Sequence, residues 1–424
     1  NTSLLVDSAV DFELDATGST FWFTIGNGVN VLNSINTNLT GFDVDYDPPT
    51  FAQGVVKAVG DTNITADFFP AFPMPDISVN KHFSASVVKM IFFNATPPFH
   101  QLPAQGQQFF VNGSSAGGST YVIQAKGKVS TAYPGALVAI APRVGYTFRA
   151  DNCTNLYTSA VRLLGGGNMG FYEAVGGGNN HYVNVSVTRR NNSADPAVTH
   201  LLAMNADGFH STCCLHGPTL KDSTIGFTGD DFVNVHNKMS VVFDVVNSSQ
   251  LLLIDGGSGI MMGRVRAGDT MSFYKLNALT PLATAVTVSS VVAVHDPATV
   301  AAAKAAYTTI TAPPYGAHIL PRVWTSSVWR VSFSEPVGSV PRFSLAQPDG
   351  IVNTNAVVTG SHLHDGHSRV LLAKAVNMVV TDNLFERALG VYVVSEQAWL
   401  EGDLGIRGVV IANNTLVDVP NGIT

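Results

Sequence analysis

The strongest constraint on the fold is a short segment that recurs along the chain, with apolar residues on both sides of an Asn or Asp. Residues 379–385 (VVTDNLF) align with residues 410–416 (VIANNTL), and residues 220–227 (LKDSTIGF) form a looser copy. Asn or Asp beside a strand end favours a tight bend and can pair with its copy in the next repeat. Repeats of this kind stack on one another at the strand spacing of about 4.8 Å. The pattern therefore favours a parallel β-helix.

Strand patterns also dominate outside these repeats. Short alternating runs of Val, Ile, Phe and Thr are typical of strands, and clear examples lie at residues 182–188, 231–236, 377–381 and 408–412. Residues 297–307 (PATVAAAKAAY) have a helical pattern that follows an Asp-Pro start signal. A β-sandwich would instead show hairpin turns about every eight to twelve residues. We therefore expect an all-β protein built on a right-handed parallel β-helix, a solenoid of the pectin-lyase-like kind.

Two stretches depart from the rhythm of the coils. Residues 52–142 contain Phe- and Pro-rich loops, and residues 240–340 contain the helical stretch together with alternating strands. We expect both to be inserted, barrel-like β modules at the edge of the β-helix. The coils would then occupy residues 1–51, 143–239 and 341–424, and the middle section contains a cluster of aspartates.

The balance of charges excludes several classes of partner. The chain has 23 Lys and Arg against 30 Asp and Glu, a net charge of −7, and no basic stripe. This argues against nucleic acid and against an anionic membrane surface. The chain has no run of about eighteen apolar residues, so we expect no membrane span. With 12% charged and 46% hydrophobic residues, the chain can bury a large core and is not disordered.

Several features predict a secreted glycoprotein, extracellular or on the cell surface. The chain begins Asn-Thr-Ser without Met, as expected of a mature chain after removal of a signal peptide. An excess of Asn-X-Ser/Thr triplets suggests N-glycosylation. The triplets begin at Asn1, Asn38, Asn63, Asn94, Asn112, Asn152, Asn184, Asn191, Asn247 and Asn413.

The cysteines predict neither a disulfide scaffold nor a metal site. Cys153, Cys213 and Cys214 allow one disulfide with a free thiol, or three buried small residues. Cys-Cys followed by His216 is a poor zinc arrangement. Residues 362–365 (HLHD) are more typical of a solvated loop or a sugar contact than of metal ligands. We therefore expect no metal and no cofactor.

The densest polar cluster combines three aspartates from two neighbouring repeats. Asp207 lies 23 residues before Asp230 and its neighbour Asp231, a typical length for one coil, so stacking would bring the three carboxyl groups together. Like charges that close cannot all ionise freely, so at least one pKa should rise. A protonated and an ionised carboxyl group are the acid and base of a glycoside hydrolase. A calcium site, or Asp caps on the bends, is the structural alternative.

The segments around these aspartates, DGFH at 207–210 and DDFVNVH at 230–236, resemble the signature of glycoside hydrolase family 110. Further stretches resemble the same family in the same order, at residues 45–54, 267–270, 367–372, 399–402 and 409–415. The resemblance implies an exo-acting, inverting α-galactosidase on a β-helix with two inserted β-barrels. It also implies a carbohydrate as the partner.

The resemblance further implies a role for each polar residue. Asp230 would be the general acid, and Asp207 and Asp231 would together hold and activate the water. An inverting outcome needs acid and base carboxyl groups about 6.5–9.5 Å apart. The remaining sugar-binding candidates are His210, Asn234, His236, Arg369, Trp399 and Glu401. These side chains would bind sugar hydroxyls, orient the aspartates or, for the Trp, stack on the sugar ring.

The chain departs from the family pattern around the expected sugar pocket. The coil that contains Arg369 has His367 and Leu371 where the family usually has Arg and Gly. Leu400 and Asn237 stand where the family favours Tyr and Gly. These departures leave the three aspartates intact, so they bear on sugar specificity more than on hydrolysis.

Two other functions fit parts of the sequence. A pectin-type endo-hydrolase also pairs Asn-x-Asp with Gly-Asp-Asp, as at 205–207 and 229–231, but it would add Gly-His-Gly on the next coil and more clustered Lys and Arg. A structural β-helix glycoprotein of a wall, sheath or filament would explain the many triplets and an end without an obvious cap. The exposed edge of a β-helix needs a cap, so we expect either a fragment or a cap from a homo-oligomer or filament. The clustered carboxylates favour an enzyme, because a scaffold has no need of them.

Overall fold

The computed structural model describes residues 3–78, 80–102, 108–190, 193–255, 261–276, 280–312 and 327–424. Over these ranges strands greatly outnumber helices, which confirms the predicted all-β class. Its helices there are α1 (Pro297–Ile310) and the 3₁₀ turns η1 (Lys81–Ser84), η2 (Met262–Arg264) and η3 (Gln397–Trp399). The helix predicted at 297–307 is therefore present and extends to residue 310. Across the described ranges, no helix has the length and apolar character needed to cross a membrane.

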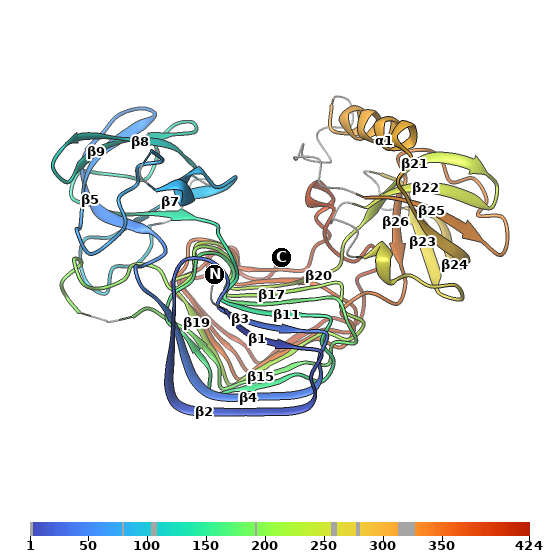
Figure 1. Cartoon of the computed structure of the whole chain (residues 1–424), viewed down its shortest axis with the longest axis horizontal. Coiled ribbons are helices and arrows are strands. Elements are labelled where there is room, and N and C mark those ends of the chain that lie inside the picture. The colour runs from blue at the N-terminus through green and yellow to red at the C-terminus, as the bar shows by residue number, and fades with distance from the viewer. Residues whose placement is uncertain are drawn as a thin grey trace.

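Two long sheets of parallel strands form the body of the protein (Figure 1). The first sheet has the order β1 (Leu4–Asp7), β3 (Val29–Leu32), β11 (Phe148–Asp151), β14 (Phe171–Ala174), β17 (Phe209–Thr212), β20 (Val233–His236), β29 (Leu371–Lys374) and β32 (Val391–Tyr392). Its register stacks Phe148 beside Phe171 and Phe171 beside Phe209, all three buried in the main core. Identical apolar positions in successive strands thus form a continuous interior.

The second sheet contains two columns of short parallel strands that extend from the long strand β4 (Ile35–Tyr46), which also pairs with β2 (Val10–Phe23). One column contains β12 (Tyr157–Ser159), β15 (His181–Val183), β18 (Thr219–Lys221), β27 (Val357–Thr359), β30 (Val379–Thr381) and β33 (Val410–Ala412). The other contains β13 (Arg162–Leu163), β16 (Ser186–Val187), β19 (Thr224–Gly226), β28 (His362–His364), β31 (Leu384–Glu386) and β34 (Thr415–Val417).

Successive strands alternate among the three columns, so each turn of the chain lies on the turn before it. After β11 the chain passes through β12 and β13 and returns at β14, directly beside β11. The repeats found in the sequence occupy equivalent places, because β30 pairs with β33 and β31 pairs with β34. The predicted stacking of these two repeats is confirmed.

Asn residues form a ladder at the bends between the columns. Asn36, Asn155 and Asn179 have φ values of 53°, 54° and 55°. Asn155 Nδ2 donates to Asn36 Oδ1 at 3.1 Å, and Asn179 Nδ2 donates to Asn155 Oδ1 at 2.9 Å. Asn suits this position because it tolerates a positive φ and offers both a donor and an acceptor.

The first insert is a six-stranded antiparallel sheet with its own apolar core. Its order is β7 (Val88–Phe93), β10 (Leu137–Pro142), β5 (Ala52–Val59), β6 (Asn63–Phe68), β9 (Thr120–Ala125) and β8 (Phe110–Gly117). A bridge between Lys89 and Phe109 brings the two ends of this order together. The insert is therefore barrel-like, and its strands fall within the predicted range of 52–142.

The second insert is a closed barrel of six antiparallel strands. Its order is β21 (Ser240–Asn247), β22 (Gln250–Asp255), β25 (Ser327–Phe333), β24 (Pro281–Val294), β23 (Thr270–Tyr274) and β26 (Leu345–Pro348). The last strand lies beyond the predicted boundary at residue 340. Both inserts rise from the same side of the parallel sheets in the view of Figure 1, and α1 packs on the barrel.

The cysteines and the glycosylation triplets have clear positions. Cys153, Cys213 and Cys214 are buried and free, which confirms the alternative of buried small residues. Asn1 and Asn191 lie outside the described residues. The exposed acceptors are Asn94, Asn112, Asn184, Asn247 and Asn413, and the half-buried ones are Asn38, Asn63 and Asn152.

Candidate functional site

A cavity of about 280 Å³ opens where the first insert, the parallel sheets and the segment after β32 meet. It is lined by Val87, Phe109, Arg143, Met169, Asp207, His210, Asp230, Asp231, Asn234, Arg369, Glu396, Trp399 and Glu401. The catalytic and sugar-binding candidates from the sequence all line this cavity except His236, which is fully buried behind His210. The structure therefore brings the predicted set to one place.

Parallel pairing of β17 with β20 places the three aspartates side by side. Asp207 stands two residues before β17, and Asp231 stands two residues before β20. Gly208 allows the close packing at this point, because a Cβ there would lie 2.3 Å from Ile225 Cγ2. One carboxylate oxygen from each of Asp207, Asp230 and Asp231 lies within 4.8 Å of the other two.

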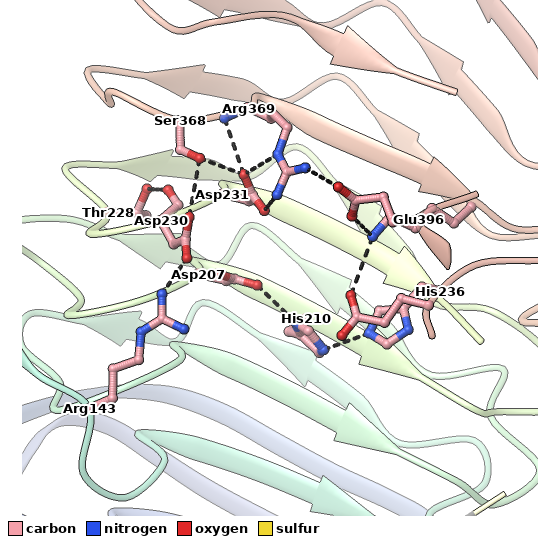
Figure 2. Close-up of polar contacts among 12 residues, drawn as sticks. Arg143, Asp207, His210, Thr228, Asp230, Asp231, His236, Ser368, Arg369 and Glu396 are labelled. Atoms are coloured by element: carbon pink, nitrogen blue, oxygen red, sulfur yellow. Dashed lines mark hydrogen bonds and ion pairs between the residues drawn. The ribbon is translucent and has the colours of Figure 1, made fainter. Parts of the chain in front are cut away.

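Asp230 is a carboxylate that the first insert holds by ion pairs. Lys89 Nζ lies 2.8 Å from Asp230 Oδ2 and also donates to Gly229 O at 3.1 Å. Arg143 contacts the same carboxylate oxygen (Figure 2). Burial alone would raise the pKa of Asp230, but the charges of Lys89 and Arg143 outweigh it and hold this pKa well below its ordinary value. Asp230 is therefore ionised.

Asp231 is held by the loop that precedes β29. Arg369 Nε donates to Asp231 Oδ1 at 2.9 Å, and Arg369 Nη2 donates to Oδ2 at 2.8 Å. The Ser368 hydroxyl donates to Oδ1 at 2.7 Å. Burial and the neighbouring charge of Asp230 nevertheless raise the pKa of Asp231 to about 6. The two adjacent aspartates thus have pKa values displaced in opposite directions, which is the pattern of a site that needs an acid and a base.

Asp207 ends a row of hydrogen bonds that passes through two histidines. His210 Nδ1 lies 2.7 Å from Asp207 Oδ2, and His210 Nε2 lies 2.9 Å from His236 Nε2. His236 Nδ1 lies 2.7 Å from the backbone oxygen of Asn237. The ring of Tyr172 stacks on His210, with 5.6 Å between the ring centroids. Burial lowers the pKa of His236 well below its ordinary value, so this histidine is neutral.

A second group of charges forms the outer wall of the cavity. Arg369 Nη1 donates to Glu396 Oε1 at 2.5 Å. The buried Lys374 contacts Glu396 and lies 3.4 Å from Glu401 Oε2. Lys238 Nζ lies 2.7 Å from Glu401 Oε1. Glu401 is thus fixed by two lysines, and Arg369 connects the outer wall to Asp231.

Two neutral side chains complete the lining. Trp399, at the end of η3, is 42% exposed at the rim of the cavity. Asn234 Oδ1 is buried and has no hydrogen-bond partner among the described residues. A ligand hydroxyl would satisfy this oxygen, because a buried acceptor without a donor is costly.

The balance of charges argues against a cation between the three aspartates, although their oxygens are close enough to hold one. The five acidic side chains of the site are Asp207, Asp230, Asp231, Glu396 and Glu401, and the five basic ones are Lys89, Arg143, Lys238, Arg369 and Lys374. Carboxylates that are already paired in this way have little net charge left for a divalent ion.

The loop between β7 and β8 docks the first insert onto the parallel sheets beside the cavity. Gln101 Nε2 donates to Thr228 O at 2.9 Å, and Gln101 Oε1 accepts from the backbone N–H of His367 at 2.9 Å. His100 Nδ1 lies 2.5 Å from Asp365 Oδ1. His367 and Asp365, two residues noted in the sequence, therefore belong to this dock. These contacts fix the position of Lys89 and Arg143 relative to Asp230.

Sequence reasoning missed Lys89, Arg143, Lys374 and Glu396. Lys89 is the single charged residue of the buried strand VKMIFF, and a lysine in such a strand needs an anionic partner. That signal was available in the sequence. Arg143 directly follows the buried strand LVAIAP, but its direction cannot be read from the pattern. Nothing in the sequence distinguishes Glu396 from other acidic loop residues.

Comparisons with known proteins add no relative. The likeness to glycoside hydrolase family 110 consequently rests on the motifs of this sequence alone. The chain matches no protein-family model and has no match among curated proteins.

Proposed function

We propose that the chain is a secreted, exo-acting glycoside hydrolase that removes a terminal α-linked galactose or a closely related sugar. One observation supports this most: three aspartates share one cavity, and their surroundings lower the pKa of Asp230 and raise that of Asp231 to about 6. Hydrolysis of a glycosidic bond needs one carboxyl group to protonate the leaving oxygen and another to activate water. The proposal includes a right-handed parallel β-helix as the scaffold, as the family resemblance implies.

The size and lining of the cavity favour a single sugar residue. Its volume of about 280 Å³ is at the lower end of the range for ligand pockets, roughly 300–1,000 Å³. Trp399 offers an aromatic face on which a pyranose ring can stack. Asn234 Oδ1 offers a free acceptor for a hydroxyl. A terminal sugar fits this description better than the middle of a long polymer.

The ion pairs change the distribution of roles that the resemblance implies. The resemblance makes Asp230 the general acid. A carboxylate that is paired with Lys89 and Arg143 enters the reaction ionised, which suits a base that takes a proton from water. In this proposal Asp230 is therefore the base, and the proton donor is one of the other two aspartates.

The spacing of the carboxylates makes the stereochemical outcome informative. The nearest oxygens of the three lie within 4.8 Å, whereas the carboxyl groups of inverting enzymes are about 6.5–9.5 Å apart. Inversion, which the resemblance implies, would require water to bind between the more distant oxygens. The anomer that is first released reports which arrangement is used.

The test is hydrolysis of p-nitrophenyl α-galactoside and of an α-1,3-linked galactose disaccharide by the wild type and by Asp230→Asn. We expect the wild type to release galactose and the variant to lose at least ~10²-fold in rate. Proton NMR of the first product identifies inversion by β-galactose and retention by α-galactose. Asp45→Asn is the matched control, because Asp45 is also buried and bonded to an arginine, Arg190, but lies outside the cavity.

Two outcomes would overturn the proposal. Release of galacturonic acid from polygalacturonate, with no action on either galactoside, would favour the pectin-type endo-hydrolase. No turnover of any of these substrates by the folded protein would favour a structural glycoprotein of a wall, sheath or filament.

A further inference from the structure

A row of three hydrogen bonds runs from the Asn237 carbonyl through His236 and His210 to Asp207. Figure 2 shows the two bonds that join His236, His210 and Asp207. We propose that these three hydrogen bonds contain one proton more than two neutral imidazoles and an ionised carboxylate can supply. The Asp207–His210 pair holds this additional proton, and the site delivers it to the substrate. The proton count stands on geometry alone. The catalytic use of the proton rests on the glycosidase function proposed above.

The proton count follows from the atoms that face one another. A hydrogen bond needs one proton between its two heavy atoms, so the three bonds in the row need three protons. The Asn237 oxygen can only accept, so the first proton is on His236 Nδ1. Two neutral imidazoles supply two protons in total, and an ionised carboxylate supplies none. The third proton must therefore be an additional one.

Burial decides where the additional proton resides. His236 has no exposed surface, and its burial lowers its pKa by more than the nearby carboxylate of Glu401 raises it. His236 is therefore neutral, with its Nε2 as an acceptor. His210 must then donate from Nε2, which leaves its Nδ1 to share the additional proton with Asp207 Oδ2. The pair is either a carboxylic acid facing a neutral imidazole or a carboxylate facing an imidazolium.

The other two aspartates of the cavity face different partners. Asp230 is contacted by Lys89 and Arg143, and Asp231 is contacted by Arg369. The nitrogen atoms of charged Lys and Arg can donate but cannot accept a proton in return. Asp207, by contrast, faces an imidazole nitrogen that can share a proton with it. This difference selects Asp207 as the carboxyl group best placed to deliver a proton.

The ring of His210 is surrounded by side chains from β14, β20 and the segment after η3. Tyr172 from β14 stacks on its ring, and Asn234 and His236 from β20 lie beside it. Glu401, from the segment after η3, lies close enough to His210 for this histidine to contribute to the lowered pKa of Glu401.

In the reaction, the proton would pass from Asp207 to the oxygen of the leaving group while the bond between that oxygen and the sugar carbon breaks. A water molecule supplies the hydroxyl group that replaces the leaving group, and the ionised Asp230 takes the water's proton. His210 is a positioning residue that keeps the proton at Asp207, and His236 fixes the tautomer of His210. Proton exchange with solvent restores the starting state.

Nitrogen NMR of the protein with ¹⁵N-labelled histidine tests the proton count without any substrate. We expect His236 to be neutral with its proton on Nδ1, and His210 to have a proton on Nε2 and a shared proton at Nδ1 at pH 7. The resonances are assigned with His236→Gln. In Asp207→Asn, the amide N–H donates to His210 Nδ1, so His210 should become a neutral imidazole. Carbon NMR of the Asp207 carboxyl group completes the count. A proton found neither on His210 Nδ1 nor on Asp207, or a His236 without a proton at Nδ1, would overturn the proposal.

Substrates with different leaving groups test how the proton is used. A dinitrophenolate leaves without protonation, whereas a sugar alcohol needs a proton. We expect Asp207→Asn to lose ~10²–10⁴-fold on the disaccharide and far less on dinitrophenyl α-galactoside. Asp230→Asn should lose comparably on both. We also expect His210→Gln to shift the alkaline limb of the pH–rate profile, which loss of packing alone would leave in place.

The two sets of measurements separate the two proposals. If the wild type hydrolyses no galactoside but the nitrogen NMR is as expected, the glycosidase function fails and the stored proton stands. In another outcome the wild type is active, Asp230→Asn keeps its activity on the dinitrophenyl substrate and Asp207→Asn loses it. The glycosidase function then stands, and the role of Asp207 as proton donor is overturned.

Discussion

The two inserts differ in how they reach the cavity. The first insert places Lys89 and Arg143 directly against Asp230 and lines the cavity with Val87 and Phe109. The barrel of the second insert supplies none of the described lining residues. It packs instead against Leu400, in the segment that also contains Trp399 and Glu401. One insert thus acts on the charge of a catalytic candidate, and the other supports the rim.

This difference predicts two kinds of mutational effect. A change in the first insert should alter both stability and the pH dependence of activity, because it alters the protonation of Asp230. A change in the barrel, away from the rim segment, should alter stability alone.

Replacement of Lys89 should have the largest effect. In Lys89→Met, Asp230 loses a buried ion pair, which is expected to reduce the free energy of unfolding by about 3–5 kcal/mol. The pKa of Asp230 should rise because a positive charge has been removed. We therefore expect the acidic limb of the pH–rate profile to shift to higher pH. Denaturant unfolding and hydrolysis rates measure the two effects.

Lys57→Met is the matched control in the same sheet. Lys57 lies 3.0 Å from Asp67, but its side chain is 57% exposed, and exposed ion pairs contribute at most about 1 kcal/mol. We expect little change in stability and none in the pH–rate profile. An equal shift of the profile in both variants would show that the contact of Lys89 with Asp230 is not its cause.

His200 lies where the first insert packs on the parallel sheets, and it should make the free energy of unfolding depend on pH. Its ring packs at the edges of the Phe51 and Phe72 rings, and burial lowers its pKa to about 3. The unfolded chain binds a proton near pH 6.5, but the folded chain does not until about pH 3. The free energy of unfolding should therefore fall as the pH drops below about 6.5, by about 1.4 kcal/mol per pH unit from this group.

The His200→Leu variant isolates this contribution. We expect the loss of unfolding free energy between pH 7 and pH 5 to be smaller in the variant than in the wild type by about 2 kcal/mol. His295→Leu, at an exposed position beside α1 in the second insert, should leave the wild-type pH dependence unchanged. Equal pH dependence in the wild type and both variants would contradict the assignment to His200.

The parts of the fold that repeat could be predicted from the sequence. The copies at residues 379–385 and 410–416 pair in register, because a repeat specifies both its own strands and the place of its neighbour. The spacing of about one coil predicted that the aspartates lie together, but the register of β17 with β20, which pairs Phe209 with Val233, places Asp207 beside Asp231 and not Asp230. The interior of the body and the aspartate cluster followed from periodicity alone.

The contacts that come from the inserts could not be predicted in this way. Arg143 reaches an aspartate 87 residues away along the chain, and Lys89 reaches the neighbouring Gly229 from 140 residues away. No sequence repeat relates such positions, because these contacts depend on how the insert packs on the parallel sheets. The proton count at Asp207 also required three distances between atoms, because the residue types alone allow several tautomers.

The smallest effect is expected in the second insert, at the start of α1. The Asp296 carboxylate accepts a hydrogen bond from Thr299 N at 2.8 Å and caps the helix. Asp296→Ala should reduce the free energy of unfolding by about 1 kcal/mol, and Asp296→Asn, which keeps a capping oxygen, should lose less. Because α1 packs on the barrel and not on the cavity, neither variant should change the hydrolysis rate or its pH profile. A changed profile in either variant would show that the barrel also acts on the charges of the cavity, and the contrast between the two inserts would then fail.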